Sequence, residues 1–240
     1  QTENFCGPAS LAMAMNWAGR GISVDELAAQ TFTPGKKGTL QADILGATRR
    51  NGMLAIPVEG IAPLLTEIAA GNPVVILQNQ AFSWYHEWHY AVAIGYDLKE
   101  AELTLHSGSD AYKKVDLREF ESSWALGQYW GVVVLPASKL SATGDDLAHA
   151  AAGSALEQVG KLAEAEQVYQ NTLTRWPRSL GALIGLGNTR YTTGDYKGAV
   201  LVLARAARMH PESSIVKNNL ATAQAAAKAS PPIRAPRPAE

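Results

Sequence analysis

The sequence predicts an α+β domain followed by an all-α domain. Three observations lead to this prediction: the first 50 residues carry helical patterns, residues 54–135 carry short runs of strand length, and the remainder is rich in Ala and Leu without a strand pattern. With 240 residues, of which 47% are hydrophobic, the chain can build one large core or two of ordinary size.

Three helices are predicted at the start of the chain. Pro8 stands near a first-turn position, so Cys6 is expected at the N-terminus of the first helix. Ser23 and Glu26 form a capping box for the second, and Thr39 is expected to cap the third. The predicted ranges are 9–20, 24–31 and 40–51.

An antiparallel sheet is predicted next, because six short runs are rich in Val, Ile and Tyr. They are residues 54–58, 73–78, 89–96, 101–106, 111–115 and 129–135. Two helices are expected between these strands, at residues 62–70 and 116–126. We assign residues 1–136 to this α+β domain.

The second domain is predicted from an internal repeat. Residues 137–146 are small and polar and are assigned as a linker, and residues 230–240, with four prolines, are expected to be disordered. Within residues 147–229, small residues and a proline recur at a spacing of 34: Gly153, Gly160, Ala165 and Pro177 return as Gly187, Gly194, Ala199 and Pro211. The pattern resembles the tetratricopeptide repeat, with helix pairs 147–158/161–175 and 181–192/195–208 and a capping helix at 213–229.

Composition excludes several classes of function. The net charge is −1 and the basic residues are scattered along the chain, which argues against nucleic acid or an anionic membrane as a partner. No apolar run approaches the roughly 20 residues that span a bilayer. The single cysteine excludes an internal disulfide and a Cys-rich zinc site, and no metal or organic cofactor is implied. The sequence opens at Gln1 without Met, so we expect that an upstream segment, such as a signal peptide, was removed; exported and cytoplasmic locations both stay open.

Cys6 is the candidate nucleophile. A helix N-terminus presents unsatisfied N–H groups and a positive dipole end, which favour a thiolate there. The backbone N–H of Cys6 is then available to an oxyanion, and Gln1 is the candidate for the second donor. His89 is the preferred general base because it begins a strand; His86 competes, but it lies within an aromatic loop.

The residues Gln1, Cys6-Gly7-Pro8-Ala9 and His89-Tyr90-Ala91-Val92 together resemble the bacteriocin-processing peptidases that cut double-glycine leaders. Those enzymes are papain-like cysteine peptidases, and the resemblance covers about residues 1–136. It implies that Cys6 attacks the scissile carbonyl, that His89 transfers the proton, and that Gln1 lines the oxyanion hole. It also implies an Asp that orients the histidine.

That orienting residue is not evident in this sequence. Ser107 falls at the position of the family's Asp, and His106 and Asp110 are its alternatives, whereas Asp97 belongs to the far end of the strand pair. Trp84, Tyr85 and Trp88 are expected to form a substrate-contacting wall beside His89.

The sequence therefore predicts a thiol peptidase that acts on a peptide or protein, with repeats that dock a partner or substrate. One alternative is a non-catalytic peptide-binding module with a degenerate peptidase fold, and another is acyl transfer to an amine.

Overall fold

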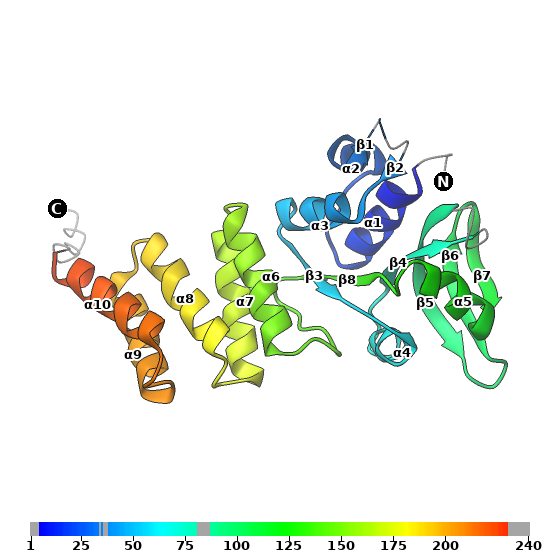
Figure 1. Ribbon diagram of the computed structural model, residues 1–240. Helices are drawn as coiled ribbons and strands as arrows, with labels where there is room; N and C mark the ends of the chain where they lie inside the picture. The colour runs from blue at the N-terminus through cyan, green and yellow to red at the C-terminus, as the bar shows by residue number, and fades with distance from the viewer. Residues whose placement is uncertain (1–4, 34, 36–37, 81–86, 230–240) are drawn as a thin grey trace, which may run out of the picture.

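A computed structural model describes residues 5–33, 35, 38–80 and 87–229 (Figure 1). The α+β part contains helices α1 (Cys6–Trp17), α2 (Val24–Thr31), α3 (Gln41–Arg50), α4 (Ile61–Ala69) and α5 (Leu117–Leu126). Its strands are β1 (Phe32–Thr33), β2 (Gly38–Thr39), β3 (Met53–Pro57), β4 (Val74–Asn79), β5 (Trp88–Asp97), β6 (Glu102–Ser107), β7 (Asp110–Asp116) and β8 (Gly131–Pro136). Helices α6 (Asp146–Gln158), α7 (Leu162–Arg175), α8 (Leu180–Thr192), α9 (Tyr196–Met209) and α10 (Ser214–Ala229) follow. Within the described ranges, every helix is too short or too polar to cross a bilayer.

The main sheet has six antiparallel strands in the order β3-β8-β4-β5-β6-β7. Strand β8, the last in sequence, lies between β3 and β4, while β4 to β7 follow one another along the sheet. This order places β5 and β6 side by side, so His89 and Ser107 come from neighbouring strands. The predicted α+β class and antiparallel sheet are confirmed.

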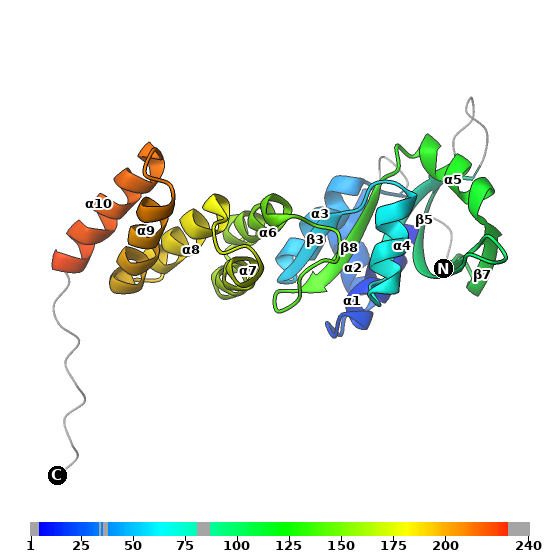
Figure 2. The same cartoon turned by 90° about the horizontal axis from the view of Figure 1, so that it is seen from below.

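The two faces of the sheet have separate cores, because alternate residues of a strand point to opposite faces. Val75, Tyr90 and Val92 pack beneath α1, α2 and α3. Ile76 and Ala91 pack on the other face, against α4 and α5. Figures 1 and 2 show these helices on their two sides of the sheet.

The core beneath α4 and α5 continues into the repeats. Ile56 of β3 and Leu135 of β8 belong to the same cluster of buried side chains as Leu156 of α6 and Tyr169 of α7. Because β3 is an edge strand, α6 covers an edge of the sheet that would otherwise be open.

A buried carboxylate connects the two parts as well. Glu67 of α4 is fully buried and accepts hydrogen bonds from Asn72 Nδ2 (2.7 Å), Ser141 Oγ (2.5 Å), and Thr143 N (2.8 Å) and Oγ1 (2.7 Å). Burial raises the pKa of Glu67, but these hydrogen bonds outweigh burial and leave its pKa below the ordinary value. The carboxylate therefore holds residues 141–143 against α4.

Close helix contacts explain the small residues of the repeat. A Cβ at Gly153 would lie 2.6 Å from the Tyr169 ring, and one at Gly187 would lie 2.6 Å from Leu203 Cγ. Large residues on α7 and α9 thus fill the space that glycines leave on α6 and α8. The repeat expectation is confirmed, with helix ends within a residue or two of the predicted ones.

Two local predictions near the N-terminus were wrong. Helix α1 begins at Cys6, as expected, but it ends at Trp17 and not at residue 20. Thr39 does not cap α3: it pairs with Phe32 in a short β1-β2 ladder that we did not predict, and Leu40 precedes the helix, with its N–H donating to Asp43. Two-residue strands leave too little pattern to recognise in a sequence.

Candidate active site

Cys6 is the first residue of α1 and is half-buried. The residue before it, Phe5, caps the helix without a side-chain hydrogen bond, and its ring stacks on Phe32 with the centroids 5.6 Å apart. This stacking fixes the entry of the chain into α1. Cys6 and Gly7 contribute the N–H groups of this first turn, since Pro8 has none, and the N-terminal end of a helix favours an anion.

Gly7 is required by a close contact beside the cysteine. A Cβ at this position would lie 2.6 Å from Thr39 Cβ, closer than real carbon atoms approach. The hydroxyl of Thr39 is buried and has no hydrogen-bond partner among the residues that the structure describes. The Cys-Gly pair thus reflects the packing of β2 against the start of α1.

His89 is held by Ser107. The two side chains are joined by a hydrogen bond of 2.9 Å between Nε2 and Oγ, and Ser107 is only 6% exposed. Burial lowers the pKa of His89, the charge of Lys113 lowers it further, and Glu87 acts in the opposite direction. The ring is therefore biased towards its neutral form, with Nδ1 free to act as a base when Nε2 donates to Ser107.

Cys6 packs against the same core as Tyr90, the residue after His89. Both belong to the core beneath α1, whereas Ala91 belongs to the opposite core. Burial raises the pKa of Tyr90, and the electrostatic effects of the nearby Cys6 and Asp43 raise it further. No hydrogen bond joins Cys6 to His89 within the described part of the chain. Sequence reasoning did not single out Tyr90, although strand alternation would have placed it on the face of α1.

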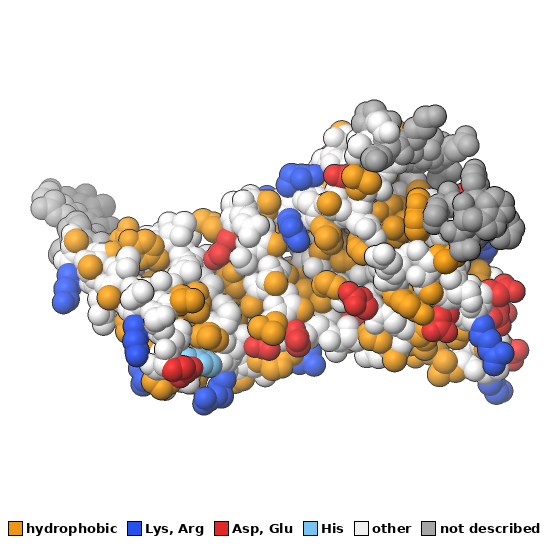
Figure 3. All heavy atoms as spheres, viewed as in Figure 1, with side chains coloured by type: hydrophobic (Ala, Val, Ile, Leu, Met, Phe, Trp, Pro, Cys, Tyr) orange, Lys and Arg blue, Asp and Glu red, His pale blue; other side chains and the backbone are white. Residues whose placement is uncertain are grey.

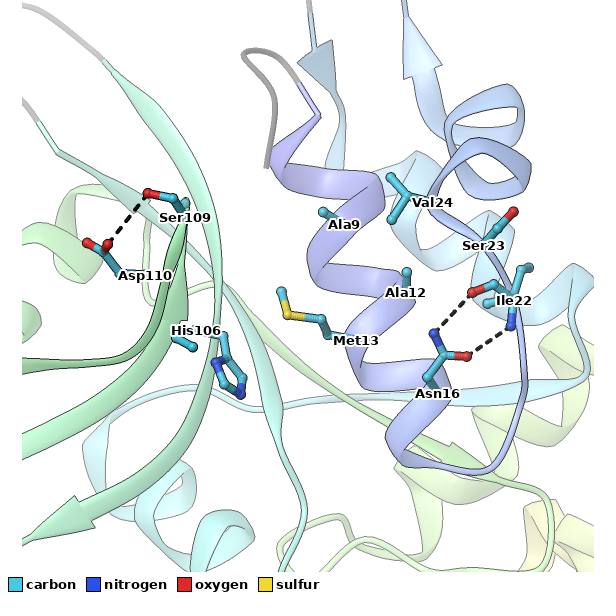
Figure 4. A pocket seen from close by; sticks show the side chains of 12 residues that line it. Ala9, Ala12, Met13, Asn16, Ile22, Ser23, Val24, His106, Ser109 and Asp110 are labelled. Carbon is cyan, nitrogen blue, oxygen red and sulfur yellow. Dashed lines mark hydrogen bonds between the residues drawn. The ribbon is translucent and has the colours of Figure 1, made fainter.

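A groove of about 460 Å³ runs along α1 on the same side of the sheet. Ala9, Met13 and Asn16 line it from the helix, at spacings that continue the face of Cys6. The opposite wall comes from β6 and the turn into β7. In Figure 4, Met13 and His106 face each other across this space. The full lining is Ala9, Ala12, Met13, Asn16, Ile22, Ser23, Val24, His106, Gly108, Ser109, Asp110 and Ala111.

The alternatives to Ser107 lie elsewhere. His106 pairs with Val92 and faces the groove, and its ring lies edge-on to Tyr112, with centroids 5.1 Å apart. Asp110 contacts Ser109 Oγ at 3.5 Å. Asp97 lies at the far turn, where it accepts hydrogen bonds from two backbone N–H groups. Of these candidates, Ser107 is the one bonded to His89.

Most of the remaining predicted site residues lie outside the part of the chain that the structure describes. Trp88 starts β5 and is 49% exposed, as a wall residue beside His89 would be. Gln1, Trp84, Tyr85 and the competing His86 lie outside the described residues.

The chain matches the Peptidase_C39 like family over residues 1–129. It belongs to this family. The tetratricopeptide repeat matches over residues 150–214 and 185–231, so the C-terminal helices are tetratricopeptide repeats. A search of curated proteins returned no match.

Two solved structures are similar to this Peptidase_C39-like chain. The peptidase domain of Streptococcus ComA, described as a bifunctional ABC transporter involved in a quorum-sensing pathway, shares 21% identity, with a TM-score of 0.47. The match covers 57% of this chain and 93% of that domain. A putative C39-like peptidase from Bacillus anthracis shares 19% identity, with a TM-score of 0.48, over 58% of this chain and 90% of that one.

Proposed function

We propose that the protein is a thiol peptidase in which Cys6 is the nucleophile and His89 the general base. The observation that carries this proposal is the hydrogen bond between His89 and Ser107, since it engages one ring nitrogen and leaves the other for the thiol. Membership of a peptidase-like family and the position of Cys6 at the start of a helix support it.

In the proposed reaction, Nδ1 of His89 takes the thiol proton as Cys6 Sγ attacks the scissile carbonyl carbon. The backbone N–H of Cys6 stabilises the oxyanion, with Gln1 as the expected second donor. The imidazolium then gives its proton to the leaving amine, and water hydrolyses the acyl-enzyme. Because Cys6 and His89 are not hydrogen-bonded, the pair must close when substrate binds, which is common for catalytic contacts in unliganded enzymes.

We propose that the groove along α1 binds the part of the peptide that adjoins the scissile bond. Its helix wall offers Ala9, Ala12 and Met13, which are small or flexible apolar side chains. Asn16 is occupied by the backbone of Ile22, to which it both donates and from which it accepts a hydrogen bond. We infer that this wall selects peptide residues by shape and apolar contact.

The repeats are proposed to dock a protein partner or the substrate. We keep residues 1–136 as the peptidase-like domain and residues 147–229 as the repeat domain. The buried Glu67 contacts tie the connecting residues to α4, so we infer that the two domains move as one body.

A non-catalytic peptide-binding module is the second candidate. Ser107 favours it, because a neutral hydroxyl stabilises an imidazolium less than a carboxylate does. The unbonded arrangement of Cys6 and His89 favours it as well. In this case the groove binds peptides that are never cut.

Alkylation of Cys6 by iodoacetamide, followed by mass spectrometry across pH, tests the catalytic pair. We expect Cys6 to react well below pH 8 in the wild type and to lose this reactivity in His89→Ala. The matched control is His210→Ala, which removes an imidazole from the C-terminal end of α9 in the repeats and should leave the profile unchanged. Reaction only near the roughly 8.5 at which an unperturbed thiol ionises would contradict the peptidase proposal.

Cleavage is measured separately with a peptide mixture from a digested proteome. New termini produced by the wild type, but not by Cys6→Ala, support hydrolysis. Retention of uncut peptides by both proteins, without new termini, supports the binding module instead.

A further inference from the structure

The second repeat carries an exposed basic surface on α9. Lys197, Leu201, Arg205 and Arg208 are spaced four, four and three positions apart, so they lie on one side of the helix. We call these four residues the α9 face. Leu201 stands between the cations and is 71% exposed.

The α9 face is basic because Lys and Arg outnumber Asp and Glu in this part of the chain. Residues 178–229 contain seven Lys or Arg and two Asp or Glu, whereas residues 1–136 contain nine and fourteen. In Figure 3, separate Lys and Arg side chains lie over the end of the molecule formed by α9 and α10, with a carboxylate and a histidine beside one of them. Within the described ranges, none of the three cations of the α9 face forms an ion pair. Two carboxylates lie near this end: Asp195 caps α9 two residues before Lys197, and Glu212 lies 3.8 Å from His210 Nδ1.

The corresponding face of the first repeat differs in its charge and in its contacts. The residues 34 positions earlier, on α7, are uncharged: Ala163, Gln167, Asn171 and Thr174. Asn171, the counterpart of Arg205, donates a hydrogen bond of 3.0 Å to the carbonyl of Ala137, in the segment that leaves the sheet. The face that binds the connecting segment through Asn171 in the first repeat is thus basic in the second.

Part of the α9 face is fixed in place. Arg205 donates to the carbonyl of Pro177 at 2.8 Å, and Arg178 donates to the carbonyl of Met209 at 3.4 Å. His210 donates from Nε2 to the carbonyl of Arg178 at 2.8 Å. A guanidinium has five N–H donors, so each arginine keeps donors for a ligand after these bonds. Arg205 is therefore presented at a fixed position, at lower entropic cost than a free side chain would be.

We propose that the α9 face binds an acidic segment of a partner protein, with carboxylates on Lys197, Arg205 and Arg208 and an apolar residue on Leu201. Charge complementarity favours an acidic partner, and the exposed leucine favours a protein over a nucleic acid or a lipid headgroup. This surface is separate from Cys6, so the inference stands whether or not the chain is a peptidase.

Fluorescence anisotropy tests the inference with the full chain. The probe is a fluorescein-labelled peptide in which Glu-Leu-Asp-Glu is repeated three times. We expect Lys197→Glu/Arg208→Glu to weaken binding about tenfold, and Leu201→Ser to weaken it about threefold. A rise from about 50 to about 300 mM NaCl should weaken binding to the wild type several-fold. The matched control is Lys217→Glu/Lys228→Glu on α10, which makes the same charge change in the same domain and should retain the wild-type affinity.

Four results would overturn the inference. The first is equal binding of the peptide by the α9 double variant and the wild type, and the second is an equal loss of affinity in the α10 control. The third is tighter binding of a DNA duplex or of phosphatidylserine vesicles than of the peptide. The fourth is self-association of the wild type in sedimentation that the α9 double variant abolishes, which would make the acidic half of a second copy the occupant.

Discussion

Replacing Ser107 with Asp should make Cys6 more reactive. The new carboxylate would lie beside Nε2 of His89, where the serine hydroxyl now lies at 2.9 Å. Two unit charges about 4 Å apart attract by about 4 kcal/mol at an effective dielectric constant of about 20. Ser107 is 6% exposed, so desolvation of the carboxylate offsets much of this gain. If about 1.4 kcal/mol remains, the thiolate–imidazolium pair becomes about tenfold more populated near pH 7.

The assay is the rate of Cys6 alkylation by iodoacetamide at pH 7, together with NMR titration of the His89 ring. Ser107→Asp should raise both the rate and the pKa of His89, and Ser107→Ala should lower the rate, because it removes the partner of Nε2. Ser109→Asp is the matched control: it adds the same charge two residues away, on an exposed turn. An alkylation rate in Ser107→Asp at or below that of the wild type, in a folded protein, would refute the role assigned to Ser107.

Two further predictions concern stability. Gly7→Ala should lower the free energy of unfolding by about 1–3 kcal/mol, because its Cβ meets Thr39, and adding Thr39→Gly should restore most of the loss; urea unfolding measures both. The pKa of Glu67 in the folded protein lies below its ordinary value of 4.5. Its contribution to stability is therefore present above pH 4.5 and is lost as the pH falls through the folded pKa. Glu67→Gln should therefore cost about 3 kcal/mol at pH 7 and flatten the acid limb of stability against pH, and a variant with an unchanged acid limb would contradict this account.

Local patterns in the sequence were sufficient for the elements and for the first members of the site. Hydrophobic periodicity and turn residues located the helices and the strands of the main sheet, since both depend on residues close in the chain. The spacing of 34 between small residues revealed the repeats for the same reason. Cys6 at a helix start and His89 at a strand start were also readable locally.

For the pairing of β5 with β6, the sequence predicted only a range of residues that could lie beside His89. The antiparallel hairpin predicted that residues 106–110 return beside His89, but the register that selects one of them depends on the irregularity between Ala93 and Gly95. That irregularity has no clear signal in the sequence. The structure therefore decided that Ser107 meets His89, and that His106 turns to the groove.

Contacts between segments that are distant in the chain could not be predicted from the sequence. The burial of Glu67 under residues 141–143, and the fit of Gly7 beneath Thr39, join segments whose proximity no local pattern encodes. The sequence by itself determined that a cysteine begins a helix, that a histidine begins a strand and that a helical repeat follows. Only the tertiary structure decided which polar group holds the histidine and how the repeats close the edge of the sheet, because packing and register fix these contacts.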